Sequence, residues 1–162
     1  MSAPSTLRID GLVAHPLELN YDKLLAMDAA AQVADVSRVD PARKGDAVRL
    51  SAILKLAGVK PEGDYLTLHA SLDDFHASVP LAEVRERGLL IYRLDGEPLP
   101  RKSGGPIRFL IPDYAACKTA EIDDCANVKF VDRIEITHGR GHDNRPHDED
   151  EHAELHRRQE TE

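Results

Sequence analysis

The chain has 162 residues, a length typical of one domain with a sizeable core. Hydrophobic residues make up 41% of it and aromatic residues 4%, with no tryptophan, so we expect a core of aliphatic side chains. The formal net charge of −8 argues against nucleic acid and anionic membranes as partners, because both attract positive charge.

The chain carries no sign of a membrane span or of a signal peptide. No apolar segment reaches the length of a span, and Met1–Asp10 lacks a basic stretch followed by an apolar one. We therefore expect a cytoplasmic protein. The two cysteines, Cys117 and Cys125, are too few for a disulfide scaffold and match no common zinc spacing, so the simplest interpretation is two reduced thiols in or near the core.

The first predicted elements are a strand and a short helix. Leu7 and Ile9 alternate with polar residues, which predicts an edge strand over Thr6–Gly11. Asn20 is a good N-cap for a helix over Tyr21–Met27. The inward-facing residues of that helix are expected to be Leu24 and Leu25.

A second helix is predicted after a stretch that is hard to interpret. Residues 29–46 show no clear periodicity beyond a brief strand candidate near 33–36. Ser51 then caps a helix that Gly58 closes. Its inward-facing residues are expected to be Ile53, Leu54 and Leu56.

The second half of the chain contains mostly strands. Tyr65–Ala70 and Phe75–Val79 flank a turn and predict a hairpin, and Pro80 opens a third helix that ends before Gly88. A last strand is predicted over Val128–Ile136. Strands outnumber short helices, which indicates an α+β domain with a mixed or mostly antiparallel sheet.

The passage from Leu89 to Pro112, LLIYRLDGEPLPRKSGGPIRFLIP, holds the most information about function. An apolar strand leads into the turn Asp95-Gly96, and two prolines stiffen the chain that follows. The loop Ser103-Gly104-Gly105-Pro106 has little side-chain bulk, so we expect that a ligand can approach its N–H groups. Arg108 follows at once on the next strand.

This order of features resembles the signature of the sulfite-oxidase-type molybdopterin-binding domain family. The resemblance extends, through softer motifs, over roughly Leu7 to Ile136. It implies an α+β fold with a mixed sheet. It also implies a molybdenum cofactor, that is, a phosphate-bearing pterin that holds molybdenum through its dithiolene.

The resemblance also implies particular cofactor-binding residues. Arg108 corresponds to the family arginine that bonds the phosphate or the pterin, and Ser103, with Gly104 and Gly105, lies where relatives contact the pterin. Asn127 and Lys129 are the best counterparts of a family Ser-x-Lys segment that holds the phosphate. Lys118 is a second candidate for that lysine. The structural alternatives are a strand-end ion pair for Arg108, for example with Asp95, and an ordinary exposed residue for Lys129.

The chain departs from the family pattern at the metal. In relatives a cysteine thiolate before the second helix ligates molybdenum, but Val33–Val48 contains no cysteine and has Ser37 at about that place. One alternative is a relocated metal site made by Cys117 and Cys125 with a carboxylate, His69 or His76.

Two functions therefore remain open. The first is a molybdopterin-dependent oxidoreductase domain that acts on a small substrate such as an oxyanion or a sulfoxide, with a redox partner protein. The second is a catalytically degenerate member that binds an anionic small molecule or a protein partner. The preserved loop with Arg108 favours the first, and the missing cysteine favours the second.

The composition changes after Thr137. Residues 138–162 contain eight acidic residues, four arginines and five histidines, so we divide the chain into a domain over 1–137 and a disordered acidic, His-rich tail over 138–162. His152 and His156 would share a helical face and suit weak binding of nickel, copper or zinc. The alternative is a solvated tail whose histidines have no specific role.

Overall fold

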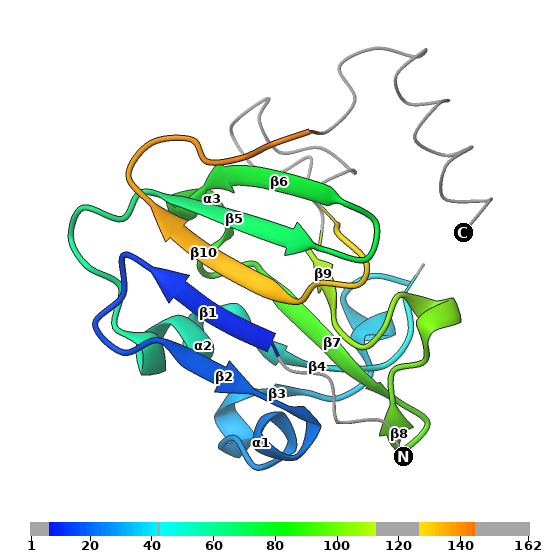
Figure 1. Ribbon diagram of the computed structural model, residues 1–162. Helices are drawn as coiled ribbons and strands as arrows, with labels where there is room; N and C mark the ends of the chain where they lie inside the picture. The colour runs from blue at the N-terminus through cyan, green and yellow to red at the C-terminus, as the bar shows by residue number, and fades with distance from the viewer. Residues whose placement is uncertain (1–6, 42, 113–126, 145–162) are drawn as a thin grey trace.

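The computed structural model describes residues 7–41, 43–112 and 127–144, which form two β-sheets (Figure 1). The first sheet has the strand order β2-β1-β10-β5-β6. Strand β1 is parallel to β10, and the other neighbouring pairs are antiparallel. The strands of this sheet are β1 (Leu7–Gly11), β2 (Leu17–Leu19), β5 (Tyr65–Ala70), β6 (Phe75–Pro80) and β10 (Arg133–Thr137).

The second sheet has the order β3-β4-β7-β8, and β9 also pairs with β7. All of its pairings are antiparallel. Its strands are β3 (Gln32–Val33), β4 (Asp46–Arg49), β7 (Leu89–Leu94), β8 (Glu97–Pro98) and β9 (Arg108–Leu110). The prediction of an α+β fold with mixed, mostly antiparallel strands is thus confirmed.

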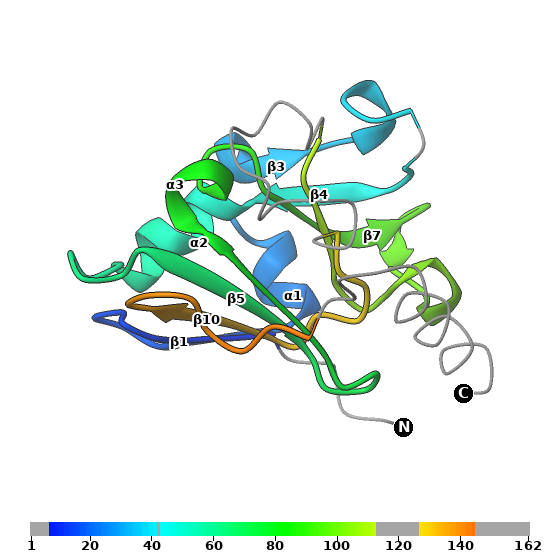
Figure 2. The ribbon, with the colours of Figure 1, turned by 90° about the horizontal axis from the view of Figure 1, so that it is seen from above.

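The helices are short, and α1 and α2 lie between the levels of the two sheets (Figure 2). They are α1 (Tyr21–Leu25), α2 (Leu50–Ala57) and α3 (Leu81–Val84), with 3-10 turns η1 (Ala29–Ala31), η2 (Val36–Arg38) and η3 (Arg101–Ser103). Asn20 caps α1 as predicted, because its Oδ1 accepts a hydrogen bond from the N–H of Lys23 at 2.9 Å. No helix in the described residues is long and apolar enough to cross a membrane.

The main core fills the space between the sheets. It takes alternate residues of each strand, such as Ile9 and Ile134, together with one face of α2. A smaller apolar cluster lies on the opposite face of the second sheet, since Ile91 belongs to it whereas Leu90 belongs to the main core. The residues of this outer cluster are Val36, Ala47, Leu89, Ile91, Leu99 and Leu110.

The structure corrects four sequence predictions. Helix α2 begins at Leu50 after the N-cap Arg49, so Ser51 lies in its first turn and does not cap it. Strand β1 is interior and not an edge, because β2 and β10 pair with its two sides. Leu25 and Leu56 point outward and are 42% and 52% exposed, because neither residue lies on the buried face of its short helix. The last strand begins at Arg133, five residues later than predicted, because Phe130 has a φ of 59° that breaks an extended strand.

Residues 138–144 lie against the first sheet, although the sequence assigns them to the tail. The N–H of Asn144 donates to the carbonyl oxygen of His76 at 2.9 Å, and the N–H of Gly141 donates to Oγ of Ser78 at 2.9 Å. The rest of the predicted tail, residues 145–162, is outside the described residues. The division of the chain at residue 137 stays a prediction.

Candidate cofactor site at the glycine loop

The glycine loop, residues 99–107, connects β8 to β9 and is tightly folded on itself. The N–H groups of Ser103 and Gly105 both donate to the carbonyl oxygen of Pro100, at 2.9 and 3.0 Å, and the N–H of Gly104 donates to Arg101 at 2.9 Å. These N–H groups are therefore used within the loop. This corrects the expectation that they would be presented to a ligand, because the 3-10 turn η3 already takes them.

Both loop glycines are required by close packing. A Cβ atom on Gly105 would lie 1.8 Å from the carbonyl oxygen of Leu99, which is far inside contact distance. Gly104 has a φ of 99°, a conformation that disfavours residues with a Cβ. The peptide bond between Gly105 and Pro106 is cis. The two glycines therefore permit a compact turn against which neighbouring side chains can pack closely.

A distant segment, residues 127–131, packs along this loop. The N–H of Phe130 donates to the carbonyl oxygen of Gly104 at 2.9 Å, and the N–H of Val131 donates to Ile107 at 2.8 Å. The N–H of Phe109, in β9, donates to the carbonyl oxygen of Val128 at 2.8 Å. This backbone pairing holds Lys129 beside the glycine loop.

The side chains of Arg108 and Lys129 both pack against Gly104, where a side chain on that residue would lie. A Cβ built there would be 3.0 Å from Cδ of Arg108 and 3.2 Å from Cγ of Lys129. Both cations are half-buried, and Nη1 of Arg108 also donates to the carbonyl oxygen of Ser103 at 3.5 Å. Two positive side chains at one glycine form a site suited to a phosphate or another compact anion.

Asn127 has a structural contact in this arrangement. Its Oδ1 accepts a hydrogen bond from the N–H of Ile111 at 2.7 Å, which ties residues 127–131 to the end of β9. Ser103 is half-buried at the end of η3. The structure thus brings together six of the predicted residues, which are Ser103, Gly104, Gly105, Arg108, Asn127 and Lys129.

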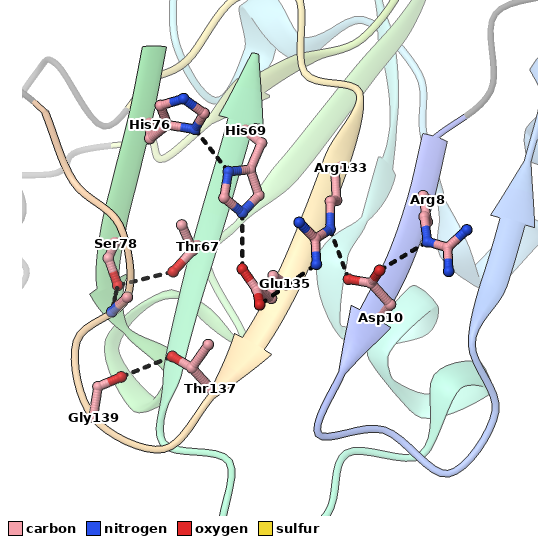
Figure 3. Close-up of polar contacts among 11 residues, drawn as sticks. Arg8, Asp10, Thr67, His69, His76, Ser78, Arg133, Glu135, Thr137 and Gly139 are labelled. Carbon is pink, nitrogen blue, oxygen red and sulfur yellow. Dashed lines mark hydrogen bonds and ion pairs between the residues drawn. The ribbon is translucent and has the colours of Figure 1, made fainter. Parts of the chain in front are cut away.

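The other predicted site residues fall outside the described residues. They are Cys117, Lys118, Cys125, His152 and His156. Within residues 7–41, 43–112 and 127–144, no group of three or more His, Cys, Asp or Glu side chains is arranged to hold a metal ion. His69 and His76, the other candidate ligands, contact each other, and His69 also contacts Glu135 (Figure 3). His76 contacts the carboxylate of Asp74.

The segment that lacks the family cysteine covers the outer cluster. Val36 belongs to that cluster together with Leu99 from the glycine loop. The Ser37 hydroxyl donates a short hydrogen bond to the Asp35 carboxylate, and this bond from Ser37 lowers the pKa of Asp35 below its ordinary value. Ser37, at about the place where the family resemblance implies a cysteine, thus has its hydroxyl engaged with Asp35.

A groove of about 860 Å³ lies elsewhere, between η1, α2 and the end of α3. Its rim carries Arg49, Lys55 and Arg85 together with Asp28 and Glu86. None of its lining residues belongs to the glycine loop or to residues 127–131. We assign the site to the loop rather than to this groove, because the loop brings together the residues that the sequence predicts to bind the cofactor.

The sequence analysis missed a line of charged side chains across the outer face of the first sheet (Figure 3). Nε of Arg133 contacts Asp10 at 2.9 Å, and Nε of Arg8 contacts the same carboxylate at 2.8 Å. Burial alone would raise the pKa of Asp10, but hydrogen bonds from Arg133 and Arg8 lower it below its ordinary value. The charged residues at alternate positions of β1 and β10 were the available signal, but their pairing depends on the parallel register.

Comparison with known proteins identifies the family. Residues 3–144 match the oxidoreductase molybdopterin binding domain. The chain belongs to this family. The match covers the glycine loop, Arg108, residues 127–131 and the described part of the His-rich segment. It favours the interpretation as an oxidoreductase domain over that as a catalytically degenerate member.

Two curated proteins and one solved structure are similar to this chain. The chain is 34% identical over 122 residues to the uncharacterized oxidoreductase YuiH of Bacillus subtilis, covering 71% of this chain and 60% of that protein. It is 31% identical over 102 residues to the mitochondrial sulfite oxidase of Drosophila melanogaster, covering 57% of this chain and 16% of that protein.

The structural neighbour is the sulfane dehydrogenase SoxCD of Paracoccus pantotrophus, with a TM-score of 0.60 and 22% identity. The alignment covers 84% of this chain and 39% of that one. The likeness confirms the sulfite-oxidase-like fold. The chain spans less than two thirds of the length of each of these three proteins.

Proposed function

We propose that this chain binds a molybdenum cofactor at the glycine loop and serves as the cofactor-binding domain of an oxidoreductase. The observation that carries the proposal is that Arg108 and Lys129, from distant parts of the chain, both pack against Gly104. A pterin cofactor carries a phosphate, and two half-buried cations held at one glycine match that group in charge.

Each residue of the site has a separate role in the proposal. Arg108 has a planar guanidinium that forms paired hydrogen bonds with phosphate oxygens, whereas Lys129 supplies a compact positive charge. Gly104 lets the stems of these two side chains pack against the backbone, and Gly105 permits the tight turn. Asn127 acts indirectly, because its bond to Ile111 sets where Lys129 lies.

The cofactor itself would supply the redox chemistry, through a molybdenum atom that exchanges electrons or an oxygen atom with a substrate. The chain's residues bind and orient it and provide positive potential that attracts an anionic substrate. The proposed substrate class is a small oxyanion or sulfoxide, and a separate redox partner protein would carry the electrons.

The test is to measure molybdenum and pterin in protein from a molybdenum-replete host. We expect molybdenum by elemental analysis and the fluorescence of oxidised pterin in the unaltered protein. Arg108→Ala should reduce both by about tenfold, a change equivalent to about 1.4 kcal/mol of binding free energy. Arg101→Ala is the matched control, because Arg101 is an exposed arginine of the same loop, and it should retain the cofactor.

Two results would contradict the proposal. If the unaltered protein contains neither molybdenum nor pterin, the chain is not a cofactor-binding domain. If Arg108→Ala and Arg101→Ala retain equal pterin, the site assignment at Arg108 is wrong.

A further inference from the structure

Two histidines on neighbouring strands form a direct hydrogen-bonded pair. His69 on β5 and His76 on β6 are register partners, and their Nδ1 atoms are 2.7 Å apart. Each ring also contacts a carboxylate through its other nitrogen. Nε2 of His69 is 3.0 Å from Glu135, and Nε2 of His76 is 2.9 Å from Asp74. Figure 3 shows the pair and Glu135 on the outer face of the sheet.

Counting protons shows how many hydrogen bonds the pair can make. A carboxylate only accepts hydrogen bonds, so both Nε2 atoms must carry a proton. The contact between the Nδ1 atoms needs one N–H and one lone pair, which adds a third proton. A neutral pair has only two protons and loses one of the three hydrogen bonds, whereas a fourth proton would set two N–H groups against each other. All three contacts are hydrogen bonds at once only when the pair holds three protons.

Further protonation of this pair is unfavourable inside the fold. Burial lowers the pKa of His69 below its ordinary value, and the positive charges of Arg133 and His76 act in the same direction, against the hydrogen bond with Glu135 that raises it. His69 is only 8% exposed. A group with a lowered pKa binds the proton more tightly once its surroundings open, so falling pH favours the open state.

The pair lies under residues 138–144, which we call the C-terminal strap. Strand β6 is the edge of its sheet, and the strap takes two of its N–H groups. The N–H of His76 donates to Oδ1 of Asn144 at 2.8 Å, and the N–H of Ser78 donates to Oδ2 of Asp143 at 2.8 Å. Nδ2 of Asn144 donates in turn to the carbonyl oxygen of Asp74 at 2.7 Å.

A third histidine connects the strap to the pair. The ring centroid of His142 lies 4.3 Å from that of His76, which lies 4.9 Å from that of His69. A proton gained by His69 in acid therefore places positive charge two ring contacts away from the strap. The charged groups that act on or contact the paired rings are Arg133 and Glu135 on β10 and Asp74 in the β5–β6 turn. The strap itself carries Arg140 and Asp143, which pair with each other.

We propose that the C-terminal strap is a pH-sensitive clamp, held on β6 near neutral pH by Asn144 and Asp143 and released from β6 in acid, when the buried ring of His69 gains a proton. Release frees the N–H groups of His76 and Ser78 at the sheet edge. The inference does not depend on the proposed cofactor, because none of these residues belongs to the glycine loop.

The test is amide hydrogen exchange of His76 and Ser78, expressed as protection factors at about pH 7.5 and about pH 5, on the two sides of the ordinary histidine pKa. We expect protection to fall about tenfold or more in acid, because a proton that binds more tightly in the open state shifts the equilibrium toward that state as the pH falls. His69→Gln removes the titrating ring and should make the protection independent of pH. His15→Gln changes an exposed histidine outside the strap and should behave as the unaltered protein does.

The proposal is wrong if protection at His76 and Ser78 is equal at the two pH values in the unaltered protein. It is equally wrong if His69→Gln loses as much protection in acid as the unaltered protein. If His69→Gln does not fold, His142→Gln replaces it, because His142 is exposed. The proposal is then wrong if the protection factors of His142→Gln fall in acid as much as those of the unaltered protein.

Discussion

Oδ1 of Asn127 accepts the backbone N–H of Ile111 at 2.7 Å, and this bond joins the segment that carries Lys129 to the end of the strand that carries Arg108. Ile111 is 1% exposed, so its N–H has no access to water. The two cations of the candidate site come from parts of the chain separated by an interval that the structure does not describe. Their relative position therefore depends on contacts such as this one.

Asn127→Ala should destabilise the protein by about 1 to 3 kcal/mol, because it leaves a buried N–H without its acceptor. The measurement is the free energy of unfolding in urea. Asn127→Asp keeps an acceptor at the same place and should retain most of the stability. Equal losses in the two variants would show that the contact to Ile111 is not what Asn127 contributes.

Gly104→Ala should disturb both the backbone and the two cations. A φ of 99° costs a residue with a Cβ about 1 to 2 kcal/mol, and the new atom would also press on Cδ of Arg108 and Cγ of Lys129. We expect a loss of stability together with a loss of bound pterin, measured by urea unfolding and by pterin fluorescence.

Gly139→Ala is the matched control for that prediction. Gly139 also has a positive φ, of 79°, but a Cβ there meets nothing within 4 Å. Gly139→Ala should lose stability through backbone strain alone, and its pterin content should stay unchanged. If Gly104→Ala also leaves the pterin content unchanged, the space beside Gly104 is not part of the cofactor site.

Ser37→Cys should supply the sulfur that Val33–Val48 lacks. On the proposed function, a thiolate is a better ligand for molybdenum than a hydroxyl that donates to Asp35. We expect X-ray absorption at the molybdenum edge to show one additional sulfur neighbour of the metal. Ser51→Cys on α2 places a thiol beside the separate groove and should give no such signal, whereas a signal from both variants would point to nonspecific binding by thiols.

Asp10→Asn should destabilise the first sheet by about 1 to 2 kcal/mol at neutral pH, because it removes a charged acceptor shared by Arg8 and Arg133. The pKa of Asp10 is lowered in the folded protein. Its stabilising contribution is therefore fully present above the pKa of the unfolded chain, near 4, and is lost as the pH falls through the lower folded value.

The pH dependence of unfolding checks this sign. The difference in free energy of unfolding between Asp10→Asn and the unaltered protein should shrink as the pH falls below about 4. Asp22→Asn, at an exposed position of α1, should show little difference at any pH. A difference for Asp10→Asn that stays constant into acid would mean that the carboxylate charge is not involved.

Local sequence signals predicted several elements well. Asn20 caps α1, Gly58 ends α2 with a φ of 70°, and Asp95-Gly96 turns between β7 and β8 with positive φ at both residues. Each of these outcomes depends on the conformational preferences of one or two residues. Errors arose where packing decided the outcome, as at Leu56, which the periodicity of a short helix placed inside although it is 52% exposed.

The sequence by itself determined the α+β class, the hairpin of β5 and β6, and the order of motifs that indicated the family. Only the tertiary structure decided that Lys129 lies beside Arg108 at Gly104, that the loop N–H groups are already used, and that His69 meets His76 under the strap. The physical reason is the distance along the chain over which each interaction acts. Alternation, caps and turns reflect neighbours along the chain, whereas the charge and hydrogen bonding of a site depend on strand register and on segments that meet only after folding.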